Sequence, residues 1–302
     1  MILVTGSTGF IGRALIRQLT DGGYPLRMLI RPSPKSPNLP RGVAVEAAVS
    51  SLLDERNLRV ALVGVDTVIH LASAELHGQR GSLLKVDIQG TQILCRAAAQ
   101  AGVRRMVMVS HLGADRASAY PLLKAKAIAE EYVRRSGIDY TILRTGIVFG
   151  KGDHFTTRLA RLARLSPFVF LVPGDGLTLL QPLWVEDLVT CLAWSLEKTD
   201  MLNQTISIGG PEFIPFNEIV QTVLAKIRLR RRLVHFSPAY MRYITILLEN
   251  WLPGLPVTSY WLDYLSANRT SSLDTITRIF SLLPSRFSHR LDHLLPEPRR
   301  SA

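Results

Sequence analysis

Cysteine is scarce in this chain, and long apolar runs are absent. The 302 residues include two cysteines, Cys95 and Cys191, both inside apolar helical patterns. We therefore predict buried thiols in a protein of a reducing compartment rather than a disulfide-held fold. Neither a basic leader nor a long apolar run precedes the first strand, so we expect no signal peptide and a cytoplasmic location.

Acidic residues are also in short supply. The chain has 24 Asp and Glu against 36 Lys and Arg, a formal charge of +12. Such a charge suits an anionic cofactor, an acidic partner or a lipid surface. The arginines are scattered and form no recognition motif, so nucleic acid is not expected as a partner, and no metal site is predicted. The hydrophobic content of 47% is ordinary for a globular enzyme with a sizeable core.

A glycine-rich turn between a strand and a helix stands at the N-terminus. After the apolar stretch Ile2–Thr5, glycines recur at every third position, Gly6, Gly9 and Gly12, and an amphipathic helix follows. Gly6 can form a tight turn, Gly9 lets the backbone approach a pyrophosphate, and Gly12 lets the helix pack on the strand. The positive end of the helix would face the phosphates. The turn therefore predicts a dinucleotide site that also includes Thr8, Phe10 and Ile11.

Strands and helices alternate as far as about residue 150. Nearly continuous apolar strands separated by helices predict an α/β fold, a Rossmann-type doubly wound parallel sheet over residues 1–150. We expect residues 151–295 to return to this core and to form a smaller, mostly helical substrate or partner lobe, and residues 296–302 to be a mobile tail. The further expected strands are 26–30, 43–48, 65–71, 106–110 and 140–144, and the expected helices are 85–101 and 125–136.

Ligands of such sheets bind beyond the carboxyl ends of the strands. Gly6, Arg31, Ala72, Ser110 and Thr145 fall at these ends. The predicted cofactor residues at the later strand ends are Leu71, Ala72, Ser73, Thr145, Gly146 and Ile147.

Five motifs along the chain carry a family resemblance: Thr5–Gly12, Val86–Thr91, Gly102–Ser110, Asp139–Gly150 and Gln181–Leu188. Together they resemble the extended and atypical short-chain dehydrogenases, whose bacterial members are usually called epimerase/dehydratase family proteins. Within that superfamily the chain is most similar to the NmrA-like group that contains the NADPH-binding accessory subunit of respiratory complex I. The resemblance implies an NAD(P)(H)-dependent oxidoreductase or epimerase that acts on a small carbonyl or sugar-like substrate. The alternative is a cofactor-holding assembly or redox-sensing protein without turnover.

The residues after the second strand indicate which cofactor is preferred. NAD-preferring enzymes commonly place an acid there, whereas this chain has Arg31 and Lys35. A guanidinium can hold a 2′-phosphate through two hydrogen bonds, so NADP(H) is predicted, with NAD(H) as the alternative. Ser51 and Leu52 stand where relatives often carry an Asp-Leu pair, and they are the predicted adenine contacts.

The resemblance also implies a catalytic tyrosine and lysine four residues apart. Tyr120 and Lys124 have this spacing, but Pro121 pushes Tyr120 out of the helical region and is itself well placed as the first helical residue. In the other alignment Lys126 binds the nicotinamide ribose, and Leu122, which cannot transfer a proton, occupies the tyrosine position. We prefer the second alignment.

Two polar residues at the end of the fifth strand are further catalytic candidates. Ser110 resembles the serine with which the family polarises its substrate. His111 is a candidate donor to a substrate carbonyl, although a lone histidine at a strand end is more often structural.

The segment 240–265 is unusually apolar and aromatic, and Pro253, Gly254 and Pro256 interrupt it. No stretch reaches the roughly 20 residues of a membrane-spanning helix. Two interpretations remain: core helices that close a substrate cleft, or a surface that docks on a membrane or a hydrophobic protein.

Overall fold

The computed structural model describes residues 1–33, 45–251 and 258–295, so Lys35, the prolines and glycine at 253–256 and the predicted tail 296–302 lie outside the described residues. The chain forms two compact units, and each is described by itself. The first unit comprises Met1–Glu75, Gly81–Thr145 and Leu188–Ser207, and the second comprises Leu76–Arg80, Gly146–Asp187 and Ile208–Ala302.

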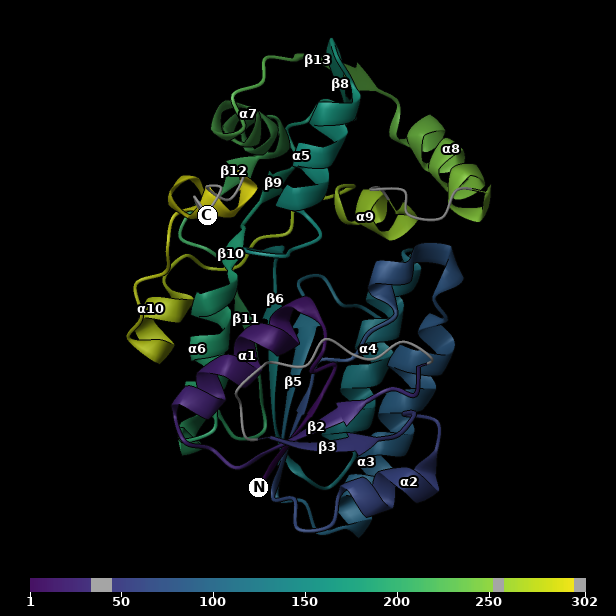
Figure 1. Ribbon diagram of the computed structural model, residues 1–302, viewed down its shortest axis with the longest axis vertical. Helices are drawn as coiled ribbons and strands as arrows, with labels where there is room; N and C mark the ends of the chain where they lie inside the picture. The colour runs from purple at the N-terminus through teal and green to yellow at the C-terminus, as the bar shows by residue number, and fades with distance from the viewer. Residues whose placement is uncertain (34–44, 252–257, 296–302) are drawn as a thin grey trace, which may run out of the picture. The chain divides into compact units, whose positions relative to one another are not determined.

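A seven-stranded sheet in the order β11-β6-β5-β4-β1-β2-β3 forms the centre of the first unit (Figure 1). The chain runs outward from β1 to β3, returns to β4 beside β1, and then runs the other way to β6, so the sheet is doubly wound. The pairs of neighbouring strands from β3 to β6 are parallel. The strands are β1 (Ile2–Thr5), β2 (Leu26–Ile30), β3 (Glu46–Val49), β4 (Thr67–His70), β5 (Arg105–His111), β6 (Asp139–Thr145) and β11 (Gln204–Ile208).

Helices cover both faces of this sheet, as predicted for a Rossmann-type fold. In Figure 1, α1 (Phe10–Asp21) and α6 (Val185–Ser195) lie on one face, and Gln18 donates to Thr190 between them at 3.2 Å. The other face carries α2 (Glu55–Ala61), α3 (Gly90–Gln100) and α4 (Pro121–Arg134). Aliphatic side chains of the strands and of these three helices form a buried core.

Three elements differ from their predictions. The segment predicted at 43–48 is described as a strand at 46–49, and three of its four residues are exposed because β3 is an edge strand with one neighbour. The helix predicted at 85–101 begins as one π-helical turn, Leu84–Gln89, and continues as α3. The helix predicted at 125–136 is α4, which begins four residues earlier, at Pro121.

Both cysteines are buried and unbridged, as predicted. Burial raises the pKa of the Cys95 thiol to about 12, so this thiol stays protonated and unreactive.

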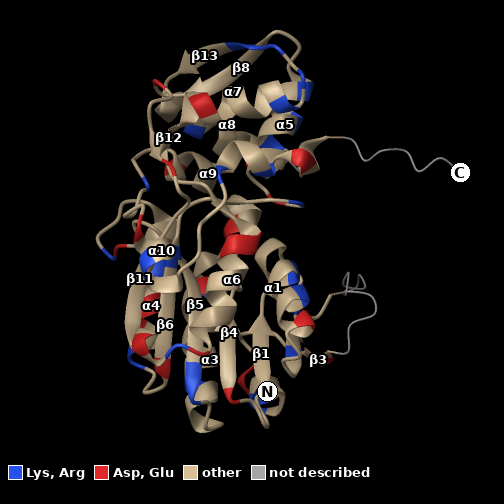
Figure 2. Cartoon of the chain, turned by 90° about the vertical axis from the view of Figure 1, so that its left-hand side faces the viewer, with Lys and Arg blue, Asp and Glu red and all other residues tan. Residues whose placement is uncertain are grey.

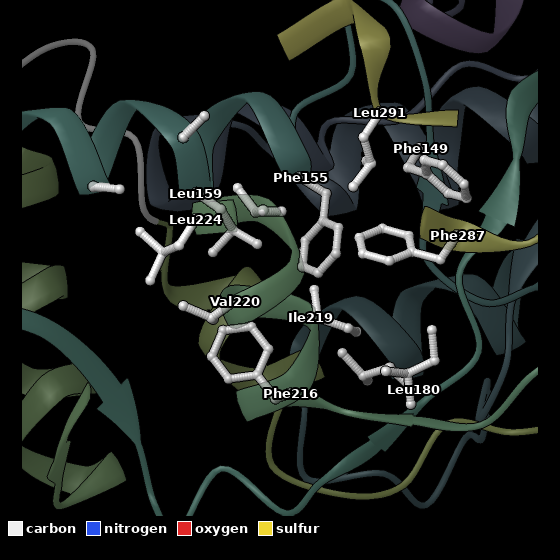
Figure 3. Packing of buried hydrophobic residues seen from close by; sticks show 14 of the residues in the cluster. Phe149, Phe155, Leu159, Leu180, Phe216, Ile219, Val220, Leu224, Phe287 and Leu291 are labelled. Carbon is white, nitrogen blue, oxygen red and sulfur yellow. The ribbon is translucent and has the colours of Figure 1, made fainter. Parts of the chain in front are cut away.

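The second unit has its own aromatic core. Phe149 and Phe287 pack edge to face with 4.9 Å between ring centroids (Figure 3). Helices α5 and α7 supply most of the aliphatic partners. The elements of this unit are β7 (Val148–Phe149), α5 (Thr156–Leu165), β8 (Val169–Pro173), β9 (Leu179–Leu180), β10 (Leu183–Trp184), β12 (Ile214–Pro215), α7 (Phe216–Lys226), β13 (Arg232–Phe236), α8 (Pro238–Trp251), α9 (Ser259–Tyr264) and α10 (Thr275–Phe280).

The apolar segment 240–265 contains one buried helix, α9, and one exposed helix, α8. In α9, Tyr260, Leu262 and Tyr264 are buried, as expected of a core helix. In α8, Tyr240 and Trp251 are 66% and 80% exposed, so this helix is not a core helix. Within the described chain, none of the helices combines the length and the apolar character that crossing a bilayer would require.

Candidate functional site

The glycine turn after β1 lies where the doubly wound sheet reverses direction, beside the end of β4. Gly6 has a φ of +68°, and a Cβ at this position would lie 2.8 Å from the backbone of Leu71 and Ala72. At Gly12 a Cβ would lie 2.2 Å from the Gly6 carbonyl oxygen. These two positions therefore require glycine because backbone segments meet there.

Gly9 differs from the other two glycines. Its backbone is extended, with φ −73° and ψ 179°, and a Cβ would meet a single neighbour, the Gly6 carbonyl oxygen at 3.1 Å. A Cβ here would thus press on this one oxygen and meet no other backbone segment. No side chain caps the N-terminus of α1, and its first turn contains no acid. Thr8, Phe10 and Ile11 around it are partly exposed. An uncapped helix N-terminus behind a glycine turn fits a phosphate group.

A buried hydrogen-bond chain orders the strand ends beside this turn. The Thr91 hydroxyl donates to the Asp87 carbonyl at 2.6 Å, so the oxygen of Thr91 accepts from His70 Nε2 at 2.9 Å. His70 Nδ1 then accepts from the Thr5 hydroxyl at 2.7 Å. Thr5 Oγ1 in turn accepts the amide protons of Leu71 and Ala72 at 3.3 and 3.4 Å.

This hydrogen-bond chain requires the His70 imidazole to be neutral. Burial, with a further contribution from the Lys126 charge, lowers the pKa of His70 to about 4. The neutral ring fixes the backbone after β4, where the predicted cofactor residues Leu71, Ala72 and Ser73 lie partly exposed. Ser73 also accepts the Glu75 amide proton at 3.2 Å.

The predicted adenine and 2′-phosphate residues follow β2 and β3. Arg31 is exposed directly after β2. Ser51 follows β3, and its hydroxyl accepts the Leu53 amide proton at 3.2 Å. Leu52 packs beside Gly90 at the start of α3. A Cβ added to Gly90 would lie 3.0 Å from the Cβ of Leu52.

Lys126 is buried and forms an ion pair with Asp87, with 3.0 Å between Nζ and Oδ1. The other carboxylate oxygen of Asp87 accepts the Ala74 amide proton at 2.9 Å. Asp87 thus links Lys126 to the segment that follows β4. By contrast, Lys124 is exposed on the outer side of α4.

The proline effect predicted for Tyr120 is confirmed. Tyr120 is the residue before α4, with extended dihedrals of φ −91° and ψ 119°, and Pro121 is the first helical residue. Tyr120 therefore flanks the helix rather than sharing a helical face with Lys124. Leu122, four residues before Lys126, is buried.

Ser110 is engaged inside the first unit. Its buried hydroxyl donates to Glu130 Oε1 at 2.6 Å. Glu130 also accepts two hydrogen bonds from Arg144, at 2.9 and 2.6 Å, and one from Arg134 at 2.6 Å. This geometry favours a structural role for Ser110, because its proton is already donated.

The remaining predicted residues lie near the ends of β5 and β6. His111 Nε2 lies 2.8 Å from a carboxylate oxygen of Glu75. The Thr145 hydroxyl donates to the Ser110 carbonyl at 3.4 Å, and the next residues, Gly146 and Ile147, belong to the second unit. Among the described side chains, no three His, Cys, Asp or Glu residues gather as a metal site would require.

Sequence reasoning missed Asp87, His70 and Thr91. A usable signal was present: a carboxylate and a histidine stood inside apolar patterns, and a buried charge requires a partner. The sequence did not reveal that Lys126 is the lysine that pairs with Asp87.

Comparisons with known proteins agree with this geometry. The sequence pattern of the NAD(P)H-binding family matches residues 6–164. A curated relative, subunit 9 of the NADH dehydrogenase [ubiquinone] 1 alpha subcomplex of Arabidopsis thaliana, is 27% identical over 74% of this chain and 57% of its own length. The ceramide reductase of Caulobacter vibrioides is 32% identical over 55% of this chain and 52% of its own length.

The chain thus spans little more than half the length of these two relatives. Among solved structures, an NADPH-dependent quinone oxidoreductase from Escherichia coli with bound NADPH has the same fold. It superposes with a TM-score of 0.77, covering 97% of this chain and 99% of that one, at 19% identity.

Proposed function

Because this chain belongs to the NAD(P)H-binding family, we propose that it is an NADP(H)-dependent oxidoreductase or epimerase-like enzyme for a small carbonyl or sugar-like substrate. The observation that carries this proposal is the glycine turn in front of the uncapped α1, at the point where the sheet reverses direction. Such a turn offers backbone amides and a helix dipole to a pyrophosphate.

The preference for NADP(H) over NAD(H) rests on Arg31. Its exposed guanidinium follows β2, where an acid would favour the ribose hydroxyls of NAD(H). Two parallel, charge-assisted hydrogen bonds from a guanidinium to a phosphate supply both attraction and orientation.

Lys126 is our candidate for the ribose contact and the catalytic cation. A bound nicotinamide would supply the hydride. The ion pair with Asp87 holds the Lys126 ammonium group beside the segment that follows β4, because Asp87 also accepts the Ala74 amide proton. Lys124 lies outside this network, which supports the alignment that uses Lys126.

The alternative is a protein that holds the cofactor without turnover, in an assembly or redox-sensing role. It is favoured by Leu122, which is buried four residues before Lys126, and by Ser110, whose proton is donated to Glu130. Among the relatives, the ceramide reductase is an enzyme by name, and the NADH dehydrogenase relative is by name a subunit of a complex.

A matched set of variants separates the two functions. Purified protein is mixed with NADPH and a panel of small carbonyl compounds, and the loss of NADPH absorbance is followed. If Tyr120 only flanks α4, Tyr120→Phe and Lys124→Ala leave turnover and cofactor affinity unchanged. The double variant Lys126→Met with Asp87→Asn removes the ion pair without leaving a lone buried carboxylate, and it weakens cofactor binding.

Turnover by the wild type supports the enzyme, whereas NADPH binding with no turnover supports the holder. A general acid contributes a factor of about 10² to 10⁴ in rate. A loss of that size in Tyr120→Phe, with the Lys126 double variant neutral, would show that the other alignment is correct.

We further propose that the predicted contact of the segment 240–265 with a membrane surface or a hydrophobic protein is made by its exposed helix, α8, which would place a cytoplasmic protein at the periphery of a membrane. The exposed aromatic residues of α8 support this contact.

A further inference from the structure

Helix α8 is amphipathic, but its apolar face points outward. Tyr243 is 64% exposed and Trp251 is 80% exposed, whereas Glu249 is 6% exposed. The outward residues recur at spacings of three and four, which places them on one face of the helix. This face, called the α8 face below, comprises Tyr240, Tyr243, Ile244, Leu247, Leu248 and Trp251.

Polar contacts on the inner side fix this orientation. Arg242 Nε donates to the buried carboxylate of Asp263 in α9 at 2.7 Å. The Glu249 carboxylate accepts the amide proton of Ser259 at 2.9 Å and its hydroxyl proton at 3.2 Å. The two charged residues of α8 are therefore both used on the inner side, and the outer face of about 21 Å carries none. Rotating the helix to bury its apolar face would break both contacts.

A basic segment precedes this helix, with strand β13 between the two. Residues 226–251 contain six Lys or Arg and one Asp or Glu. Arg228, Arg230 and Arg232 are exposed, and Figure 2 shows the blue of basic residues along the segment that enters β13. Exposed apolar rings adjoin it: the Arg232 amide donates to the carbonyl of Phe168 at 3.1 Å, and the Phe236 ring packs edge to face on Tyr240.

We propose that the α8 face docks on an anionic phospholipid bilayer. The proposal rests on the contact proposed above for residues 240–265 and narrows it to one helix face and one chemistry. The helix would lie in the plane of the interface, with Leu and Ile toward the acyl chains and Tyr and Trp at the headgroup level. The arginines that precede it would meet the phosphates of the lipids.

The charge and the side-chain types favour a lipid over a protein partner. A protein interface typically rims its apolar centre with mixed charges, whereas the exposed charges before this helix are of one sign. A second copy of this basic chain would bring the same cations face to face, which is repulsive.

Vesicle flotation of the full chain tests the proposal. Vesicles of phosphatidylcholine alone are compared with vesicles that also contain phosphatidylglycerol. The α8 variant replaces Leu247, Leu248 and Trp251 with Gln, and the charge variant replaces Arg228, Arg230 and Arg232 with Gln. A matched control replaces exposed apolar residues elsewhere, Val60, Val63 and Leu283, with Gln.

The wild type and the matched control should bind anionic vesicles at least tenfold more tightly than neutral ones. The α8 variant should lose at least tenfold in binding to anionic vesicles, and the charge variant should lose its preference for them. No vesicle binding by the wild type, or equal binding by the α8 variant, would overturn the proposal. The proposal would also be overturned if light scattering showed that the wild type forms a dimer without binding vesicles, and that the α8 variant does not form this dimer. NADPH titration of the same samples shows whether each protein binds the cofactor, so a failure of vesicle binding can be told apart from a failure of the proposed cofactor function.

Discussion

At the scale of single residues, Arg31 decides the predicted cofactor preference. Hydrogen bonds to charged groups contribute roughly 1.5–3 kcal/mol net. We therefore expect Arg31→Ala to weaken NADPH binding about ten- to a hundredfold at low salt, and NADH binding much less. Because Arg31 is exposed, a higher ionic strength should narrow the difference between the affinities for NADPH and NADH.

Dissociation constants of both cofactors for the wild type and Arg31→Ala provide the measurement, with the exposed Arg56→Ala as the matched control. A wild type that prefers NADH would contradict the assignment, and so would equal weakening of both cofactors.

His70 links the site to the stability of the fold. Its pKa is lowered from 6.5 to about 4, so between these values the unfolded chain binds the proton and the folded protein does not. Above pH 6.5 the titration of His70 therefore takes nothing from the free energy of unfolding. As the pH drops from 6.5 toward 4, that free energy falls by roughly 3 kcal/mol, at about 1.36 kcal/mol per pKa unit.

Urea unfolding between pH 4 and 7 measures this dependence, with His70→Gln as the variant that lacks the titrating group. We expect the variant to be less stable at pH 7 and to lose less stability on acidification. Parallel pH profiles for the two proteins would show that His70 is not the group responsible.

Some features of single residues could be predicted from the sequence, and others could not. The steric need for glycine at Gly6 and Gly12 was predictable, because the tight turn and the close packing of helix on strand each exclude a side chain. The partner of Lys126 was not, because the ion pair joins residues 39 positions apart whose contact depends on tertiary packing. The same holds for Ser110, whose pairing with Glu130 no local pattern indicated.

At the scale of elements, Glu130 ties α4 to β5 and β6. Its buried carboxylate accepts four hydrogen bonds, from Ser110, Arg134 and Arg144. Glu130→Gln removes this charge and should destabilise the fold by about 3–5 kcal/mol, as breaking a buried ion pair does.

The adjacent Glu131 offers the control. It pairs with Arg135 at the surface, so Glu131→Gln should change the free energy of unfolding by at most about 1 kcal/mol. Similar losses in the two variants, measured by chemical denaturation, would be inconsistent with the described network.

The start of α4 could be predicted from one residue, although the apolar pattern alone placed it four residues too late. Pro121 indicated the first residue of α4 because proline lacks the amide proton that a helix start leaves unpaired. The orientation of α8 could not be read from its periodicity, since a pattern shows that an apolar face exists and not which side it points to. Its inner contacts with Asp263 and Ser259 decide that orientation. The π-helical turn before α3 had no sequence signal that we recognised.

At the scale of the whole molecule, the fold class could be predicted because the strand and helix pattern repeats along half of the chain. The division into units was harder to predict. A return of the chain to the core was expected within residues 151–295, but the sequence did not show that residues 188–207 make it, because this depends on contacts in three dimensions. Substrate and partner depend on the second unit, where the sequence pattern is less regular.

The central claim is that the glycine turn binds a dinucleotide, and Gly9→Leu tests it most directly. The backbone of Gly9 is one that any residue adopts, and its Cβ would lie 3.1 Å from one carbonyl oxygen, so the variant should fold. Gly12→Ala is the contrast, because its Cβ would lie 2.2 Å from backbone and should lower the melting temperature.

The measurement is calorimetric titration of the wild type and Gly9→Leu with NADPH and NADH, alongside their melting temperatures. We predict that the wild type binds at least one of these cofactors, and that Gly9→Leu melts within a few degrees of it but binds neither cofactor. Unchanged affinity in a folded Gly9→Leu variant would contradict the claim.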